Sequence, residues 1–294
     1  MRVLLPILLT AALSAQAESL SSVVITTEAP HNQQPALLHT EDVTVIQGKD
    51  RIRASNLVLL RGDQAALDLY ILIDDGSDSR ISLQYNDLRK FMTSQPASTR
   101  VAIGYLRNGT VMMGQDLTSD HERAGKALRL PIGPAGIAAS PYTALSDLVK
   151  KWPQTQARRE VLLITSGIDL YYGPGPDNPY LQTAISDAQK AGVLVYTIYY
   201  GADGHFGHSP WAINWGQNYL AQLSEETGAE AYWQGNINPV SFAPFLDDLT
   251  TKLNDQYRLT FEPHRGKGLE RVKVTTEVKG VEIIAPSRVS VSDH

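Results

Sequence analysis

One carboxylate and two hydroxyls follow an apolar stretch at alternating positions. The apolar stretch is Leu69–Ile73, the carboxylate is Asp75, and the hydroxyls are Ser77 and Ser79. Oxygen groups at positions i, i+2 and i+4 of one turn can face a single small cation. Hard oxygen ligands suit Mg²⁺, Mn²⁺ or Ca²⁺ better than they suit zinc or copper. This loop is therefore a candidate divalent-cation site at the end of a buried strand.

The same loop allows two other interpretations. A frame that starts at Asp74 would lose both hydroxyls, because Gly76 and Asp78 would take their places. We therefore place the candidate ligand at Asp75. The loop can also form an Asx turn that caps a helix beginning at Arg80 or the residue after it, because Asp and Ser side chains accept hydrogen bonds from the first helical amides.

Residues 65–253 alternate between apolar strands and amphipathic helices. The expected strands are Leu67–Asp74, Arg100–Leu106, Thr110–Gly114, Glu160–Thr165, Val193–Tyr200 and Glu230–Gln234, and the expected helices are Ile81–Met92, Asp120–Leu128, Thr143–Trp152, Pro179–Ala191, Ala212–Thr227 and Val240–Leu253. This order predicts an α/β fold with a doubly wound, mostly parallel sheet covered by helices on both faces. Such sheets bind ligands at the carboxyl ends of their strands, which is where the Asp75 loop falls.

The two ends of the chain have different patterns. Residues 18–64 and 254–294 show the alternation of half-buried strands, and we expect them to pack together as a small accessory sheet. Residues 1–17 have the pattern of a secretory signal peptide, with Arg2, an apolar stretch and a small-residue cleavage site. We therefore expect an exported protein, in the periplasm or outside the cell.

Composition and missing motifs argue against several function classes. The formal net charge is −5, and the absence of a basic cluster argues against nucleic-acid binding. The chain has no cysteine, and no apolar run long enough to cross a membrane. No nucleophile elbow, phosphate-binding loop or dinucleotide motif is present. A metal-dependent hydrolase is a less favoured class, because no cluster of carboxylates or histidines could activate water.

Residues 65–253 resemble the von Willebrand factor type A domain, as it occurs in bacterial secreted proteins related to that domain. The resemblance rests on the strand that enters Asp75-Gly76-Ser77-Asp78-Ser79, on the helix that follows, and on the strand ending in Thr165-Ser166-Gly167. It implies a metal-ion-dependent adhesion site that holds Mg²⁺, Mn²⁺ or Ca²⁺. In such a site, an acidic group of a protein partner completes the coordination of the ion.

The resemblance carries over residue by residue, and unevenly. Asp75, Ser77 and Ser79 match the family's first motif, and Thr143 matches its distant threonine. The family's late aspartate is replaced by Ser166. The loss of this carboxylate predicts weak binding of the ion, or binding that waits for a partner's carboxylate.

Three of these positions have ordinary structural alternatives. Thr143 can cap the helix that follows it, and Ser166 can be a plain turn residue. Asp169 could reach the metal only if the turn is rearranged, and it can otherwise be a solvated loop carboxylate.

Aromatic residues gather in the loops around the expected metal face. They are Tyr142, Tyr171, Tyr172, Phe206, Trp211 and Trp215. Aromatic side chains are enriched at interface hot spots, although they can also anchor long loops to the body of a protein. We expect a non-enzymatic, secreted adhesion module with a degenerate metal site. The alternative is an exported assembly component that binds partners without metal, through the accessory sheet or these loops.

Overall fold

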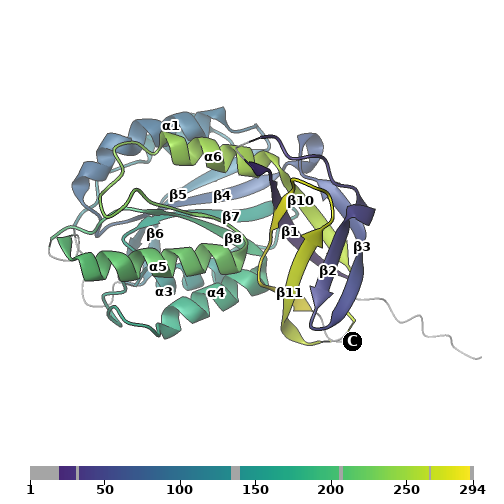
Figure 1. Cartoon of the computed structure of the whole chain (residues 1–294). Helices are drawn as coiled ribbons and strands as arrows, with labels where there is room; N and C mark the ends of the chain where they lie inside the picture. Colours follow the sequence, from purple (N-terminus) through teal and green to yellow (C-terminus); the bar gives the residue numbers. More distant parts are fainter. Residues whose placement is uncertain (1–19, 31–32, 134–139, 205–207, 265, 292–294) are drawn as a thin grey trace, which may run out of the picture.

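The α/β body is built on a six-stranded sheet with the order β6-β5-β4-β7-β8-β9 (Figure 1). The computed structural model describes residues 20–30, 33–133, 140–204, 208–264 and 266–291. The strands are β4 (Leu67–Asp74), β5 (Thr99–Arg107), β6 (Thr110–Thr118), β7 (Arg158–Thr165), β8 (Val193–Tyr199) and β9 (Ala231–Tyr232). β5, β4, β7, β8 and β9 pair in parallel, whereas β6 pairs antiparallel with β5. The sheet is therefore mixed, with its antiparallel strand at one edge.

Helices cover both faces of this sheet (Figure 1). The first face packs against α1 (Tyr85–Ser94), α2 (His121–Lys126) and α6 (Ala243–Asn254), and the second against α3 (Pro141–Lys151), α4 (Pro179–Ala191) and α5 (Pro210–Thr227). Successive side chains of a strand point to opposite faces. In β4, Ile71 and Ile73 join the first core and Tyr70 and Leu72 join the second. This alternation continues into the loop and separates Asp74 from Asp75.

The two ends of the chain form a second, antiparallel sheet beside the α/β body (Figure 1). Its strands are β1 (Ser21–Glu28), β2 (Val43–Gln47), β3 (Asp50–Leu59), β10 (Gln256–Phe261), β11 (Gly268–Thr276), β12 (Glu282–Ile284) and β13 (Arg288–Val291). The described order is β12-β1-β10-β3-β2-β11-β13. The sheet curls, since the Ser21 hydroxyl donates to the Ser290 carbonyl across it at 3.2 Å. Its interior is a separate apolar core that includes Ile25, Val45 and Leu259.

Some boundaries differ from those expected. The segment 281–291 is two short strands, because Pro286 between them cannot donate to a strand ladder. The helix expected from Ile81 begins as the 3₁₀ helix η4 (Ser79–Gln84), whose first turn is capped by Asp78 accepting from the Arg80 amide. The expected signal peptide, residues 1–17, lies outside the described residues. No helix in the described part of the chain is long and apolar enough to span a membrane.

Candidate functional site

Asp75 lies directly after β4, and its carboxylate is bound by Arg129. Arg129 Nη1 donates to Asp75 Oδ1 at 2.6 Å, and Nη2 donates to Oδ2 at 3.0 Å. The Asp75 side chain is 0% exposed, whereas the Arg129 side chain is 38% exposed. Two parallel charge-assisted hydrogen bonds are the strongest geometry for this type of pair. Both oxygens of the candidate metal ligand are therefore already engaged by a cation of the same chain.

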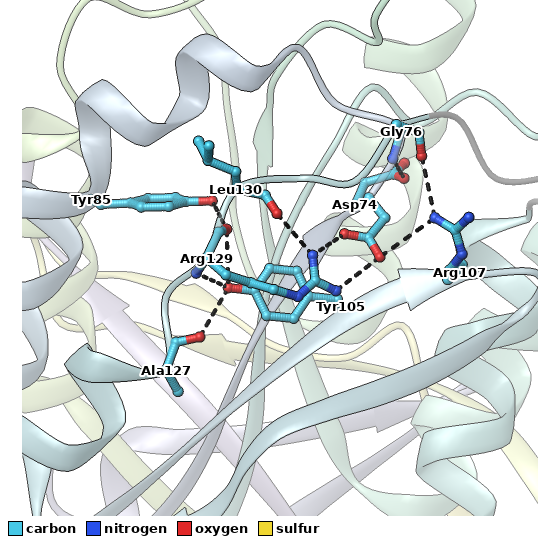
Figure 2. Close-up of polar contacts among 10 residues, drawn as sticks. Asp74, Gly76, Tyr85, Tyr105, Arg107, Ala127, Arg129 and Leu130 are labelled. Atoms are coloured by element: carbon cyan, nitrogen blue, oxygen red, sulfur yellow. Dashed lines mark hydrogen bonds and ion pairs between the residues drawn. The ribbon is translucent and has the colours of Figure 1, made fainter.

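Arg129 is held in place by its neighbours (Figure 2). Its guanidinium carbon lies 3.6 Å from the centroid of the Tyr105 ring, a cation–π geometry. Its backbone amide donates to the Tyr105 hydroxyl at 2.6 Å, and its carbonyl accepts from the Tyr85 hydroxyl at 2.5 Å. Nη1 also donates to the Leu130 carbonyl at 2.9 Å. Burial raises the pKa of both tyrosines, so they stay neutral at physiological pH.

A second arginine lies close to the same carboxylate. Arg107 Nη1 is 3.9 Å from Asp75 Oδ2 and donates to the Gly133 carbonyl at 3.4 Å. The hydrogen bonds to Asp75 raise the pKa of Arg129, which keeps its positive charge. Two guanidinium groups thus lie close to one buried carboxylate.

Asp74 lies on the other face of the sheet. Its carboxylate accepts from the Thr165 hydroxyl of β7 at 2.6 Å and from the Gly76 amide at 2.8 Å. Burial raises the pKa of Asp74, against the lowering effect of these two hydrogen bonds. The two adjacent aspartates therefore face different sides and have different partners.

The hydroxyls predicted as ligands have three different surroundings. Ser77 is buried, and its hydroxyl has no hydrogen-bond partner in the described residues. Ser79 is exposed at the start of η4. Thr143 lies inside α3, where its hydroxyl donates to the Ser140 carbonyl at 3.1 Å. Ser140, rather than Thr143, caps this helix by accepting from the Thr143 amide.

The turn after β7 makes close contacts within the protein. Ser166 is buried, and its hydroxyl accepts from the Ile168 amide at 3.4 Å. Helix α5 comes so close that a Cβ on Gly216 would lie 2.0 Å from the Ser166 carbonyl oxygen. This close approach explains why glycine stands in the middle of α5.

Asp169 is a buried tie between loops. Its Oδ1 accepts from the amides of Tyr171 and Tyr172 at 2.9 and 3.0 Å. Its Oδ2 accepts from the Ser140 hydroxyl at 2.8 Å and from the Asn178 amide group at 3.3 Å, which joins the starts of α3 and α4. The expectation that Asp169 is solvated is wrong, because its side chain is 0% exposed and four donors satisfy it.

Comparisons with known proteins find similar solved structures at low sequence identity. No family model and no curated protein matches the chain. A von Willebrand factor type A structure from Catenulispora acidiphila is 10% identical, covers 95% of this chain and 76% of its own, and has a TM-score of 0.45. A manganese-loaded TRAP protein from Plasmodium vivax is 13% identical, covers 77% and 95%, and has a TM-score of 0.42. An aerotolerance-related membrane protein from Bacteroides fragilis, carrying multiple mutations to serines, is 12% identical, covers 64% and 98%, and has a TM-score of 0.47.

The α/β body is similar to von Willebrand factor type A domains. In its sheet, the Asp75 loop occupies the carboxyl end of a central strand, as the sequence predicts.

The residues of this type A-like body do not fit a divalent ion as they are arranged. Both Asp75 oxygens bind Arg129, and Thr143 and Asp169 have other partners on the opposite face. In the described part of the chain, no group of three or more His, Cys, Asp or Glu side chains could hold a metal ion. Sequence reasoning missed Arg107 and Arg129. Arg129 is 54 residues from Asp75, and no local pattern marks it.

Exposed aromatic side chains lie near the carboxyl ends of the strands of the type A-like sheet, on the loop after β7 and at the start of α5. Tyr171, Tyr172 and Trp211 are 56%, 49% and 59% exposed. The rings of Tyr171 and Tyr172 pack edge-on against Tyr180, with centroids 5.4 and 6.3 Å apart. Trp215 is half-buried and lies 5.7 Å from the Tyr219 ring.

Two of the predicted contact residues do not join this surface. Tyr142 is fully buried, and its hydroxyl donates to the Gly167 carbonyl at 2.6 Å, so its ring cannot reach a partner. Phe206 lies outside the described residues.

Proposed function

We propose that the chain is an exported, non-enzymatic protein-binding module. Its contact surface is formed at the carboxyl ends of the strands of the six-stranded sheet, which we call the carboxyl edge. The observation that carries the proposal is the exposure of Tyr171 and Tyr172 on the loop after β7, and of Trp211 at the start of α5. Large aromatic rings supply much of the binding energy at protein interfaces while losing little conformational entropy. A partner that covers these rings would remove a large apolar area from water.

The loops that carry these rings are held by hydrogen bonds. The Asp203 amide donates to the Gly76 carbonyl at 2.9 Å, and the Asp78 amide donates to the Gly201 carbonyl at 3.1 Å, so the β4 and β8 loops are joined. Asp169 fixes the β7 loop through the amides of Tyr171 and Tyr172. A surface fixed in this way loses less entropy when it binds.

Binding on this surface proceeds without a divalent ion. The sequence predicts a metal-bridged partner, but the bidentate Arg129–Asp75 pair leaves the predicted ligand no free oxygen. The metal-independent alternative therefore agrees better with the contacts at this edge.

The test is partner capture by the chain from residue 18 onward. The protein is immobilised and exposed to a periplasmic or extracellular extract of the source cells, in EDTA and in Mg²⁺. The variants are Tyr171→Ser with Tyr172→Ser, and Trp211→Ser. Leu37→Ser is the matched control, because Leu37 is as exposed as Trp211, at 59%, and lies on the β1–β2 connection.

The expected result is one set of captured proteins that is the same in EDTA and Mg²⁺. The aromatic variants lose this set and Leu37→Ser keeps it. Capture that survives the aromatic variants, or that requires Mg²⁺, would overturn the proposal. Loss of capture with Leu37→Ser alone would indicate that the contact surface lies on the accessory sheet.

A further inference from the structure

The Asp75–Arg129 pair occupies the place where the sequence predicts a bound cation. We infer that the Arg129 guanidinium is a built-in cation that takes the place of a divalent ion at Asp75. Its two N–H groups bind both carboxylate oxygens, at 2.6 and 3.0 Å, and leave neither free for another cation. The chain thus supplies its own positive charge at the end of β4.

Charge around Asp75 also excludes a second cation. Arg107 Nη1 lies 3.9 Å from Asp75 Oδ2, so a divalent ion would approach two guanidinium groups around a single carboxylate. Repulsion between positive charges in a partly buried site is weakly screened by salt. Magnesium favours sites where carboxylates outnumber such positive charges.

The position of Arg129 is fixed rather than adaptable. The Tyr105 ring lies 3.6 Å from its guanidinium carbon, and its backbone is bound by the hydroxyls of Tyr85 and Tyr105. The Arg80 side chain, which pairs with Asp78, is by comparison 67% exposed. The Arg129 guanidinium, held by these contacts, is therefore a permanent part of the site.

One buried hydroxyl in the same loop supports this inference. Ser77 is 2% exposed, and its Oγ has no hydrogen-bond partner in the described residues. An orphaned buried hydroxyl is uncommon in folded proteins. Without the guanidinium, both the Asp75 carboxylate and the buried hydroxyl two residues away would lack a hydrogen-bond partner in the described residues.

The test is thermal unfolding of wild type and Arg129→Ala, each in EDTA, in millimolar Mn²⁺ and in millimolar methylguanidinium. Arg129→Ala with Asp75→Asn removes the carboxylate as well, and urea at equal concentration controls for denaturant effects. Where Arg129→Ala does not fold, Arg129→Lys replaces it, because an ammonium group binds one oxygen and leaves the other open. The readout is the stability of the protein alone, so it does not depend on the partner binding proposed above.

We expect both cations to raise the Tm of Arg129→Ala and to leave wild type and the double variant unchanged. A rise in the Tm of wild type with Mn²⁺, abolished by Asp75→Asn, would overturn the inference, because metal and arginine would then bind together. An Arg129→Ala protein that neither cation stabilises would overturn it as well, because the site would then accept no cation other than its own side chain.

Discussion

Two arginine–carboxylate pairs, each with a fully buried carboxylate, lie at opposite ends of the same sheet, and their geometries differ. At the carboxyl edge, Arg129 binds both oxygens of Asp75, and its own side chain is 38% exposed. At the amino edge, Arg158 Nη1 lies 4.0 Å from Glu160 Oε1, with both side chains almost fully buried. Neither Glu160 oxygen has a hydrogen-bond partner in the described residues.

The difference shows that the same kind of ion pair can serve two purposes in one protein. Arg158 donates instead to the carbonyls of Leu253 and Ala65 and to Gln256, so it joins the α/β body to the accessory sheet. Burial raises the pKa of Glu160, against the lowering effect of Arg158. At the other edge, Asp75 is fully hydrogen-bonded and its cation reaches solvent. The pair at the amino ends of the strands is a structural joint, whereas the pair at the carboxyl ends has an arginine that solvent can reach.

The largest expected effect comes from Arg129→Ala. This change leaves a buried carboxylate without its partner, and breaking a buried pair in this way costs about 3 kcal/mol or more. We expect the free energy of unfolding to fall by about 3 kcal/mol, as measured by urea unfolding at pH 7. Arg80→Ala is the control, because its exposed pair with Asp78 is worth about 0–1 kcal/mol. An equal decrease in the free energy of unfolding of the two variants would contradict the difference expected between the Arg129–Asp75 pair and the Arg80–Asp78 pair.

A smaller effect is expected from Tyr105→Phe. The ring that faces Arg129 remains, but the hydroxyl that accepts from the Arg129 amide at 2.6 Å is lost. A lost hydrogen bond of this kind costs about 1 kcal/mol. Tyr105→Leu also removes the cation–π contact and should destabilise further, again by urea unfolding. A Leu variant as stable as the Phe variant would show that the ring does not help to hold Arg129.

Glu160→Gln tests the amino edge through pH. Because burial raises the Glu160 pKa, the folded state holds this proton more tightly than the unfolded chain does. The stability that Glu160 contributes is therefore complete below its unfolded pKa and is lost as pH rises through its folded pKa. The free energy of unfolding of wild type minus that of Glu160→Gln should fall as pH rises from acid to neutral. A difference that is flat or rises with pH would show that Glu160 is charged and well paired.

The smallest effect on stability is expected from Trp211→Ser. Its side chain is 59% exposed, and surface changes of this kind usually shift the free energy of unfolding by about 0.5 kcal/mol or less. Unfolding curves that match wild type, with loss of partner capture, would place Trp211 in the contact surface. A strongly destabilised variant would show that the ring anchors the start of α5 instead.

Local patterns predicted the central strands and the position of the loop. The apolar run of β4 and the alternation of strands and helices over 65–253 are short-range features, and the structure has strands and helices in these places. Asp75 lies at the end of a central strand because its neighbours form a buried strand. In the structure, strands from the two chain ends pair in one antiparallel sheet.

The chemistry of the loop depends on distant residues and could not be predicted in this way. Arg129 reaches Asp75 from 54 positions away, and its placement depends on how α2 packs near Tyr105. Asp169 becomes a buried tie because two loops meet at it, its own and the one before α3. Alternation at the end of β4 also places Asp74 and Asp75 on opposite faces, so the motif does not collect its predicted ligands.

The most direct test of the account is calorimetric titration of Mn²⁺ into the EDTA-stripped wild-type chain. The account predicts no saturable heat of binding, because Arg129 already occupies both oxygens of Asp75. Stoichiometric binding of Mn²⁺ that Asp75→Asn abolishes would contradict it, because the aspartate would then bind a metal ion in spite of its arginine.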